Sequence, residues 1–334
     1  MCAPWRAAST AGQEKSTTRS QHTEPHPMLS KRLVTGPLLV IALLGLAVLN
    51  EYIGTLEWRT SSSFFWPMNC LGIQYVPAGA ILFVICSLVI GLASRELARV
   101  ARACSGRDDL RCLPGIITCF GILMLYAMWL SGLSPEPIIS TVMPATVLAA
   151  CFFTSLVVGC RGKRTDGATL AALTTTGFAV YLGTFLGFFM LIQVHHSIWW
   201  IIGIIAIVKM CDTGAYFTGS AIGKHKMIPW LSPGKTWEGL AGGLLASMGT
   251  AWGLAALSEH WLPSEPVVPT LVALLIGLII GISGQCGDLV MSLMKRDAGI
   301  KDSSALLPGL GGMMDVLDSP LFVAPIAWWL LLLI

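Results

Sequence analysis

Four aspartates and three basic residues that could do phosphate chemistry stand close together near the C-terminal end of the chain. They are Asp288, Lys295, Arg296, Lys301, Asp302, Asp315 and Asp318. Asp288, Ser292 and Lys295 recur at i, i+4 and i+7, the spacing of one helical face, and Asp315 and Asp318 share a face at i, i+3. Carboxylate oxygens are the ligands that Mg²⁺ prefers, and Lys and Arg neutralise phosphate. The stretch predicts magnesium-assisted phosphate chemistry; a helix hairpin capped by aspartates is the simpler alternative.

A second polar segment, residues 219–239, combines glycines with Lys224, Ser232, Lys235 and Thr236. Glycine and serine let backbone N–H groups approach an anion, and lysine supplies the charge. Residues 234–236 look like the end of a P-loop, but Pro229 stands where that motif needs glycine. The segment is therefore either a different phosphate cradle or a basic loop that touches anionic lipid.

A third candidate, Asp212, lies inside an apolar run. A charge in a membrane costs about 2.5–3.5 kcal/mol or more, so such a residue usually faces a partner or a wet cavity. Lys209, three residues earlier, could simply form a salt bridge with it. That pairing leaves Tyr216 and Gly219, which continue the Asp212 face, without an explanation.

The composition explains why these polar groups stand out. Of the 334 residues, 54% are hydrophobic and 12% are charged, with a mean hydropathy of +0.73; a soluble chain has about 25% charged residues. A polytopic membrane protein follows, which excludes a secreted enzyme, a cytosolic dinucleotide-binding domain and a coiled coil. The net charge of +3 is too small to suggest nucleic acid as a partner. The ten cysteines show no zinc or disulfide spacing, and we interpret them as reduced packing residues.

The positioning elements must be helices, because a backbone in lipid has to satisfy its own hydrogen bonds. We expect an all-α polytopic membrane protein with about nine spans of near 20 residues each. Residues 1–29 are predicted to be a disordered cytoplasmic tail, 30–197 the N-terminal transmembrane helices and 198–334 the catalytic domain. The expected spans are 33–53, 76–93, 113–133, 138–160, 169–193, 198–219, 239–257, 267–287 and 319–334.

The basic residues orient these spans. With a cytoplasmic N-terminus, 19 of the 21 Lys and Arg fall in inner segments; Arg59 lies outside and Lys209 lies within a span. The polar clusters then face the cytoplasm. The first half offers no mid-span acidic residue, and we interpret Glu96, beside Arg95 and Arg99, as a solvated surface group.

The C-terminal pattern resembles the signature of phosphatidate cytidylyltransferases, also called CDP-diacylglycerol synthases. The resemblance rests on GDLxxSxxKRxxxxKDxSxxxPGxGGxxDxxDS at 287–319 and, upstream, on Asp212 through SPGKTWEG; it covers roughly 200–325. Two positions depart from the family pattern. Leu310 replaces the usual His between the glycines, and Val316 replaces the usual Arg after the first late aspartate.

The resemblance implies transfer of CMP from CTP to phosphatidic acid, giving CDP-diacylglycerol and pyrophosphate. Asp288, Asp302, Asp315 and Asp318 would ligate Mg²⁺, with K⁺ as an optional second cation, and the basic residues would hold the triphosphate. The expected substrate-binding residues are Asp212, Tyr216, Lys224, Ser232, Lys235, Thr236, Glu238 and Ser292.

Two alternatives stay open: a CTP-dependent enzyme acting on a polyprenol or ether lipid phosphate, and a cation- or proton-coupled transporter. We expect an inner or plasma membrane location with the site facing the cytoplasm. CTP, phosphatidic acid and membrane lipids would be the partners, and the sequence does not decide whether two copies form a homodimer.

Overall fold

The computed structural model describes residues 27–55, 79–105, 112–130, 137–160, 166–261, 267–300, 304 and 311–334, and these are mostly helical. The helices are α1 (Pro27–Thr55), α3 (Ala80–Ser105), α4 (Leu113–Leu130), α5 (Pro137–Gly159), α6 (Ala168–Ala179), α7 (Phe185–His195), α8 (Ile198–Ile222), α9 (Trp237–Trp261), α10 (Thr270–Asp297) and α11 (Met313–Leu331). A π-helical turn, η2 (Val180–Thr184), joins α6 to α7. Most of the predicted N-terminal tail lies outside these residues.

Each predicted apolar segment overlaps one of these helices or the continuous run from α6 to α7. Within the described part of the chain, six helices are long and apolar enough to cross a membrane. Shorter apolar stretches lie at 40–53, 113–126 and 145–159, in α1, α4 and α5. The polytopic, helical membrane architecture expected from composition is therefore confirmed.

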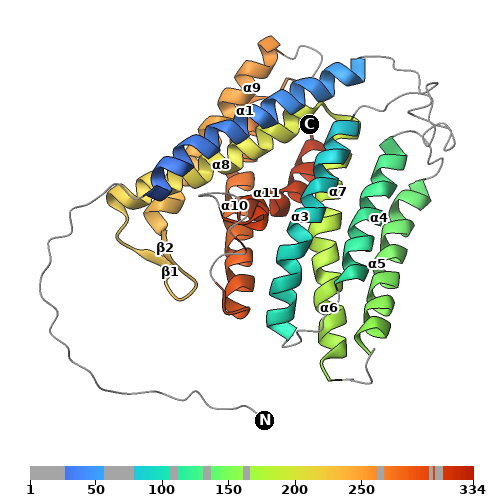
Figure 1. Ribbon diagram of the computed structural model, residues 1–334. Helices are drawn as coiled ribbons and strands as arrows, with labels where there is room; N and C mark the ends of the chain where they lie inside the picture. Colours follow the sequence, from blue (N-terminus) through green and yellow to red (C-terminus); the bar gives the residue numbers. More distant parts are fainter. Residues whose placement is uncertain are drawn as a thin grey trace, which may run out of the picture.

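The helices form two groups that meet at α11. In Figure 1, α3, α4, α5, α6 and α7 run side by side, whereas α8 and α9 lie on the opposite side of the molecule. α10 packs against α9 and α11, and α11 also contacts α7 and α3. Buried residues from both groups, among them Ile90, Met190 and Leu321, belong to one continuous core. The last helix, α11, therefore packs against helices of both groups.

Small residues allow helices α8, α9 and α10 to approach one another closely. A Cβ on Gly214 of α8 would lie 2.6 Å from the Ala246 side chain of α9, and one on Gly277 of α10 would lie 2.7 Å from Met248. Close backbone approach of this kind is how membrane helices gain packing energy, because lipid offers no hydrophobic driving force. The polar ends of α8, α9 and α10 are thereby brought together.

Helix ends differ from the sequence prediction in two places that matter for the site. α10 continues to Asp297, ten residues beyond the expected 287, so the charged stretch extends the span as one helix. α11 begins at Met313 and not at 319, so Asp315 and Asp318 lie in its first turns. The apolar run was a poor guide to these ends because polar side chains do not stop a helix once it leaves the hydrocarbon layer.

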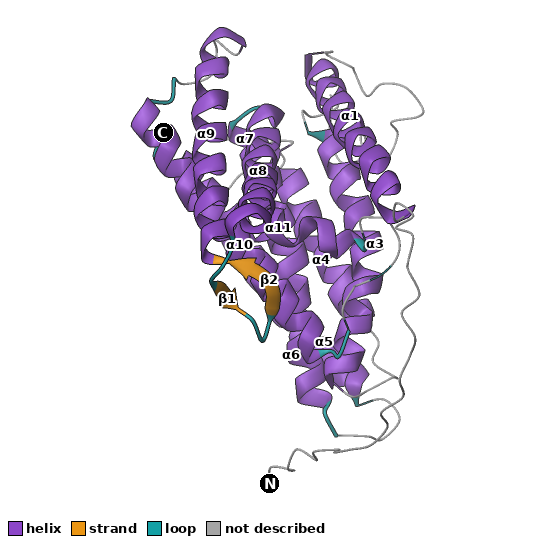
Figure 2. Cartoon of the chain, turned by 90° about the vertical axis from the view of Figure 1, so that its left-hand side faces the viewer, coloured by secondary structure: helices purple, strands orange, loops and turns teal. Residues whose placement is uncertain are grey.

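The segment between α8 and α9, expected as a loop, contains a two-stranded hairpin. β1 (Lys226–Ile228) pairs antiparallel with β2 (Ser232–Thr236), with Lys226 opposite Thr236 and Ile228 opposite Ser232. Figure 2 shows this hairpin projecting from the ends of the helices. It is a local departure from the all-helical expectation, and it places Lys235 on a strand.

Candidate active site

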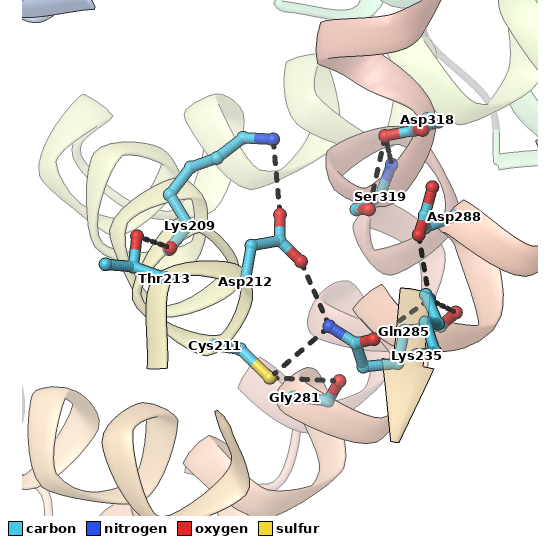
Figure 3. Close-up of polar contacts among 10 residues, drawn as sticks. All are labelled: Lys209, Cys211, Asp212, Thr213, Lys235, Gly281, Gln285, Asp288, Asp318 and Ser319. Carbon is cyan, nitrogen blue, oxygen red and sulfur yellow. Dashed lines mark hydrogen bonds and ion pairs between the residues drawn. The ribbon is translucent and has the colours of Figure 1, made fainter. Parts of the chain in front are cut away.

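A continuous polar chain links α8, α10 and the hairpin. Asp212 Oδ1 accepts a hydrogen bond from Gln285 Nε2 at 3.0 Å, and Gln285 Oε1 accepts one from Lys235 Nζ at 2.9 Å. Lys235 Nζ also lies 2.8 Å from Asp288 Oδ2. Figure 3 shows the four side chains meeting between the three elements. The sequence analysis identified three of these residues as separate candidates, and the structure connects them into one cluster: Asp212, Lys235 and Asp288.

The salt bridge between Lys209 and Asp212, which was the simple explanation for Asp212, is present, but Asp212 also has a second partner. Lys209 Nζ lies 3.5 Å from Asp212 Oδ2, at the long end of a charged contact. The shorter bond comes from Gln285. Asp212 thus faces a partner on another helix as well as its own neighbour.

The hairpin holds Lys235 in place through local contacts at the start of α9. Thr236, which is buried, accepts a hydrogen bond from Gly239 N through its Oγ1 at 3.1 Å and so caps that helix. Glu238 accepts hydrogen bonds from the His225 backbone N–H at 3.2 Å and contacts the His225 ring. Thr236 and Glu238 therefore fix the hairpin on the helix beneath it, next to Lys235.

A second ion pair joins α10 to α11. Lys295 Nζ lies 2.9 Å from Asp315 Oδ1, and both side chains are mostly buried. Asp315 Oδ2 also accepts a hydrogen bond from Gly312 N at 2.8 Å. Gly311, at φ +90°, makes the turn before the helix, and a Cβ there would sit 2.8 Å from Asp315 Oδ2. The turn and the ion pair together fix the start of α11.

Asp318 lies one turn further along α11 and is 5% exposed. Its Oδ1 accepts hydrogen bonds from the backbone N–H and hydroxyl of Ser319, at 2.6 and 3.2 Å. It lies within electrostatic range of Asp288, Lys209 and Lys295. In Figure 3 the carboxylates of Asp318 and Asp288 lie near one another, across from Asp212. Three carboxylates from α8, α10 and α11 therefore border one region.

The other predicted site residues that the structure describes make no hydrogen bond or ion pair with this cluster among the described residues, and the rest lie outside them. Tyr216 is 70% exposed and its ring packs on Phe217, and Lys224 is exposed next to the hairpin. Ser232 and Ser292 are half-buried, on β2 and α10, and Arg296 is exposed near the end of α10. Lys301, Asp302 and the departing residue Leu310 lie outside the described residues.

Two residues that the sequence interpretation missed are central here. Gln285 is buried and bridges Asp212 to Lys235; its position three residues before Asp288 on an apolar helix was the available signal. Glu96 was interpreted as a solvated surface group, and this was wrong. It is 2% exposed, and its carboxylate accepts hydrogen bonds from the backbone at the start of α11.

The donor chemistry suits Mg²⁺ even though no complete protein cage is present. Among the described residues, no three His, Cys, Asp or Glu side chains are grouped closely enough to enclose a metal ion. Mg²⁺, however, is usually bound by one or two carboxylates and completed by water and substrate phosphates. Asp288 and Asp318 each keep one oxygen that pairs with nothing else in the described part of the chain. Two nearby carboxylates with free oxygens are a fitting half-site for such an ion.

The family to which these features belong is shown by comparison with known proteins. Residues 58–334 match the model of the cytidylyltransferase family, and this chain belongs to that family. A phosphatidate cytidylyltransferase of Staphylococcus saprophyticus is 31% identical over 254 residues, covering 74% of this chain and 88% of the relative.

Two further relatives align over shorter stretches. The Escherichia coli protein YnbB, described as uncharacterized, is 46% identical over 126 residues, covering 38% of this chain and 40% of its own. A phosphatidate cytidylyltransferase of Bacillus subtilis is 38% identical over 157 residues, covering 46% of this chain and 56% of its own. The aligned part of this chain thus spans about half the length of these two relatives.

Proposed function

We propose that this protein transfers CMP from CTP to phosphatidic acid, forming CDP-diacylglycerol and pyrophosphate. The observation that carries the proposal is the cluster of Asp212, Gln285, Lys235 and Asp288 at the ends of membrane-spanning helices. Several relatives that share its family are named phosphatidate cytidylyltransferases. The match to a family of cytidylyltransferases also favours an enzyme over the transporter alternative.

The reaction needs positioning and charge neutralisation more than it needs a protein nucleophile. A phosphate oxygen of the lipid attacks the α-phosphorus of CTP and forms the new P–O bond. The bond from the α-phosphorus to the α–β bridging oxygen breaks, and the electron pair leaves with pyrophosphate. Because the lipid phosphate is already an anionic nucleophile, catalysis rests on groups that hold phosphates in line.

The lysines are the natural phosphate contacts. Lys235 and Lys295 each sit beside an aspartate and are only 16% and 14% exposed, so their charges are weakly screened by water. Phosphate oxygens can replace or share the carboxylate contacts of these lysines. Gln285 keeps Lys235 aimed between α8 and α10 while this exchange takes place.

Asp288 and Asp318 would hold Mg²⁺, which when bound neutralises charge on the triphosphate and polarises its oxygens. Asp315 and Asp302 belong to the same proposal from the sequence pattern, although Asp315 is engaged by Lys295 in the structure. A second cation such as K⁺ is part of this proposal and is tested by varying it at fixed Mg²⁺.

Membrane orientation follows the charge distribution. We propose a cytoplasmic N-terminus, about nine spans, and a site facing the cytoplasm of the inner or plasma membrane, where CTP is available. The shorter apolar helices in α1, α4 and α5 would supply the spans beyond the six long ones. Assembly as a homodimer is a separate proposal, tested by the mass of the purified protein in detergent.

A direct assay tests the reaction. Purified protein is given CTP, Mg²⁺ and phosphatidic acid, and both pyrophosphate release and CDP-diacylglycerol formation are measured. Product with phosphatidic acid supports the proposal. Product only with a polyprenol phosphate or an ether lipid phosphate supports the second candidate, which stays open because Leu310 and Val316 stand where the family pattern has a His and an Arg. No product with any lipid contradicts both.

A further inference from the structure

The helix that carries Asp315 and Asp318 is capped by a side chain from the other half of the molecule. Glu96, on α3, accepts a hydrogen bond from Met313 N at 2.9 Å through Oε1 and one from Met314 N at 2.9 Å through Oε2. Its Oε1 also accepts a hydrogen bond from the Ser304 hydroxyl, in the segment that leads into the helix. One carboxylate therefore binds both the first turn of α11 and the chain before it.

This remote cap replaces a local one that the sequence cannot provide. The first N–H groups of a helix have no partner within the helix, and Ser, Thr, Asp or Asn at the cap position usually supplies one. Gly312 occupies that position and has no side chain. The Asp315 carboxylate accepts a hydrogen bond from Gly312 N, and the Glu96 carboxylate accepts hydrogen bonds from Met313 N and Met314 N. The start of α11 is thus fully bonded only while α3 stays in place.

The burial of Glu96 makes this contact specific. At 2% exposure, a carboxylate must be compensated by hydrogen bonds or by opposite charge. The start of α11 offers both, because its N–H groups and its helix dipole favour an anion. A displacement of α11 would leave a buried carboxylate, the buried N–H of Met314 and the partly buried N–H of Met313 without these partners, so the contact resists sliding of the helix.

A second buried contact from the N-terminal half reaches the same helix one turn later. Tyr181, in the π-helical turn η2, donates a hydrogen bond to the backbone carbonyl of Asp318 at 3.1 Å. The Tyr181 side chain is 6% exposed. π-Helical turns are uncommon and are frequently found at functional sites. This turn presents a hydroxyl to the backbone of a candidate metal ligand.

We propose that Glu96 and Tyr181 are positioning residues that fix Asp315 and Asp318 relative to α10, so the N-terminal helices are part of the catalytic apparatus. The proposal rests on the cytidylyltransferase function for its kinetic consequence, but not for its structural one. Neither side chain is assigned contact with a substrate. Each acts through α11. On that helix, Asp315 must pair with Lys295, and Asp318 must lie beside Asp288.

The Glu96 contact is tested by Glu96→Gln, with Glu51→Gln as the matched control. Glu51 also caps a helix, accepting a hydrogen bond from Ile198 N at 3.0 Å at the start of α8, and among the described residues it makes no hydrogen bond to α11. Glutamine keeps the size of Glu96 yet turns one acceptor into a donor that faces an N–H group. We expect amide exchange at Met313 and Met314 to rise about 10- to 100-fold, and kcat to fall by a similar factor with little change in the KM for CTP.

Glu96→Asp and Ser304→Ala keep the test informative if Glu96→Gln folds poorly. Aspartate retains the charge but is one methylene shorter, and Ser304→Ala removes the hydroxyl contact while leaving the two backbone contacts, so both should give intermediate exchange and intermediate kcat. Unchanged exchange at Met313 and Met314 in Glu96→Gln would overturn the cap. Equal loss of kcat in Glu51→Gln would show a general stability effect and would also overturn the proposal.

The Tyr181 contact is tested by Tyr181→Phe, with Tyr126→Phe as the control. Tyr126 is likewise buried, on α4, and makes no hydrogen bond to α11 among the described residues. Loss of the Tyr181 hydroxyl should raise the Mg²⁺ concentration needed for half-maximal activity about three- to ten-fold, as expected for one lost hydrogen bond. The control should leave that concentration unchanged.

The outcomes separate this proposal from the function on which it rests. Faster exchange in Glu96→Gln supports the positioning contact even if the wild-type protein makes no CDP-diacylglycerol, because amide exchange does not depend on turnover. An active wild-type protein whose Mg²⁺ requirement is unaffected by Tyr181→Phe contradicts the positioning of Asp318 and leaves the cytidylyltransferase function intact.

Discussion

The ammonium nitrogen of Lys235 lies 2.8 Å from a carboxylate oxygen of Asp288, although 53 residues separate the two in sequence. The pair ties the hairpin between α8 and α9 to the polar end of α10. Because Gln285 binds the same lysine and also Asp212, the ion pair is the central link of the cluster. A substitution of either residue should therefore lower kcat more than it lowers the stability of the protein.

Asp288→Asn should lower kcat by at least about 100-fold, because the amide keeps the shape but loses the charge that pairs with Lys235 and binds Mg²⁺. Lys235→Met should do the same through loss of phosphate contact. Pyrophosphate release from CTP measures both. The double variant Asp288→Asn/Lys235→Met should be as inactive as either single variant. Recovery of activity would show that the two residues only neutralise one another and do not bind substrate or metal.

Gln285→Leu should cost stability and activity together, because it leaves Asp212 and Lys235 without their shared partner. Hydrogen bonds to charged groups contribute about 1.5–3 kcal/mol, so a clear fall in thermal unfolding temperature in detergent is expected. Gln193→Leu is the control. Gln193 is similarly buried, but its Oε1 has no partner among the described residues, so leucine there should cost far less. Equal losses in the two variants would contradict the bridging contact.

Chelation of divalent cations should abolish turnover, and Mg²⁺ should restore it. Asp318→Asn should raise the Mg²⁺ concentration required for half-maximal activity, because one of two nearby charges on the half-site is lost. Asp297→Asn, an exposed carboxylate at the end of the same α10, is the control and should behave like wild type. A Mg²⁺ requirement that Asp318→Asn leaves unchanged would remove Asp318 from the metal proposal.

The two ends of α9 should lie on opposite sides of the membrane. In a background without reactive cysteines, Lys226→Cys on the hairpin should resist an impermeant thiol reagent in intact cells and react after lysis. Val267→Cys, 65% exposed just before α10, should react from outside. Labelling of position 226 from outside would reverse the proposed orientation and place the cluster away from CTP.

The class of protein and most of its helices can be predicted from the sequence. Transfer of an apolar side chain into lipid is a local property, so the apolar runs predicted helices that the structure contains, from α1 to α11. Charged residues in lipid are costly for the same local reason, so Asp212 and Asp288 stand out from their apolar neighbours in the sequence alone. The helix ends were predicted less well, because α10 and α11 extend into polar sequence, where hydropathy does not indicate whether a helix continues.

Which polar groups contact one another cannot be predicted from the sequence and is seen only in the folded chain. Lys235 could have paired with lipid, with Asp212 or with Asp288, and nothing in its spacing chooses among them. Glu96 is the sharper case, because its partner Met314 is 218 residues away. A carboxylate beside two arginines looks locally like a surface group, and only the packing of α3 against α11 turns it into a buried helix cap. Hydrogen bonds between distant segments depend on how helices pack, and that information is spread over the whole chain.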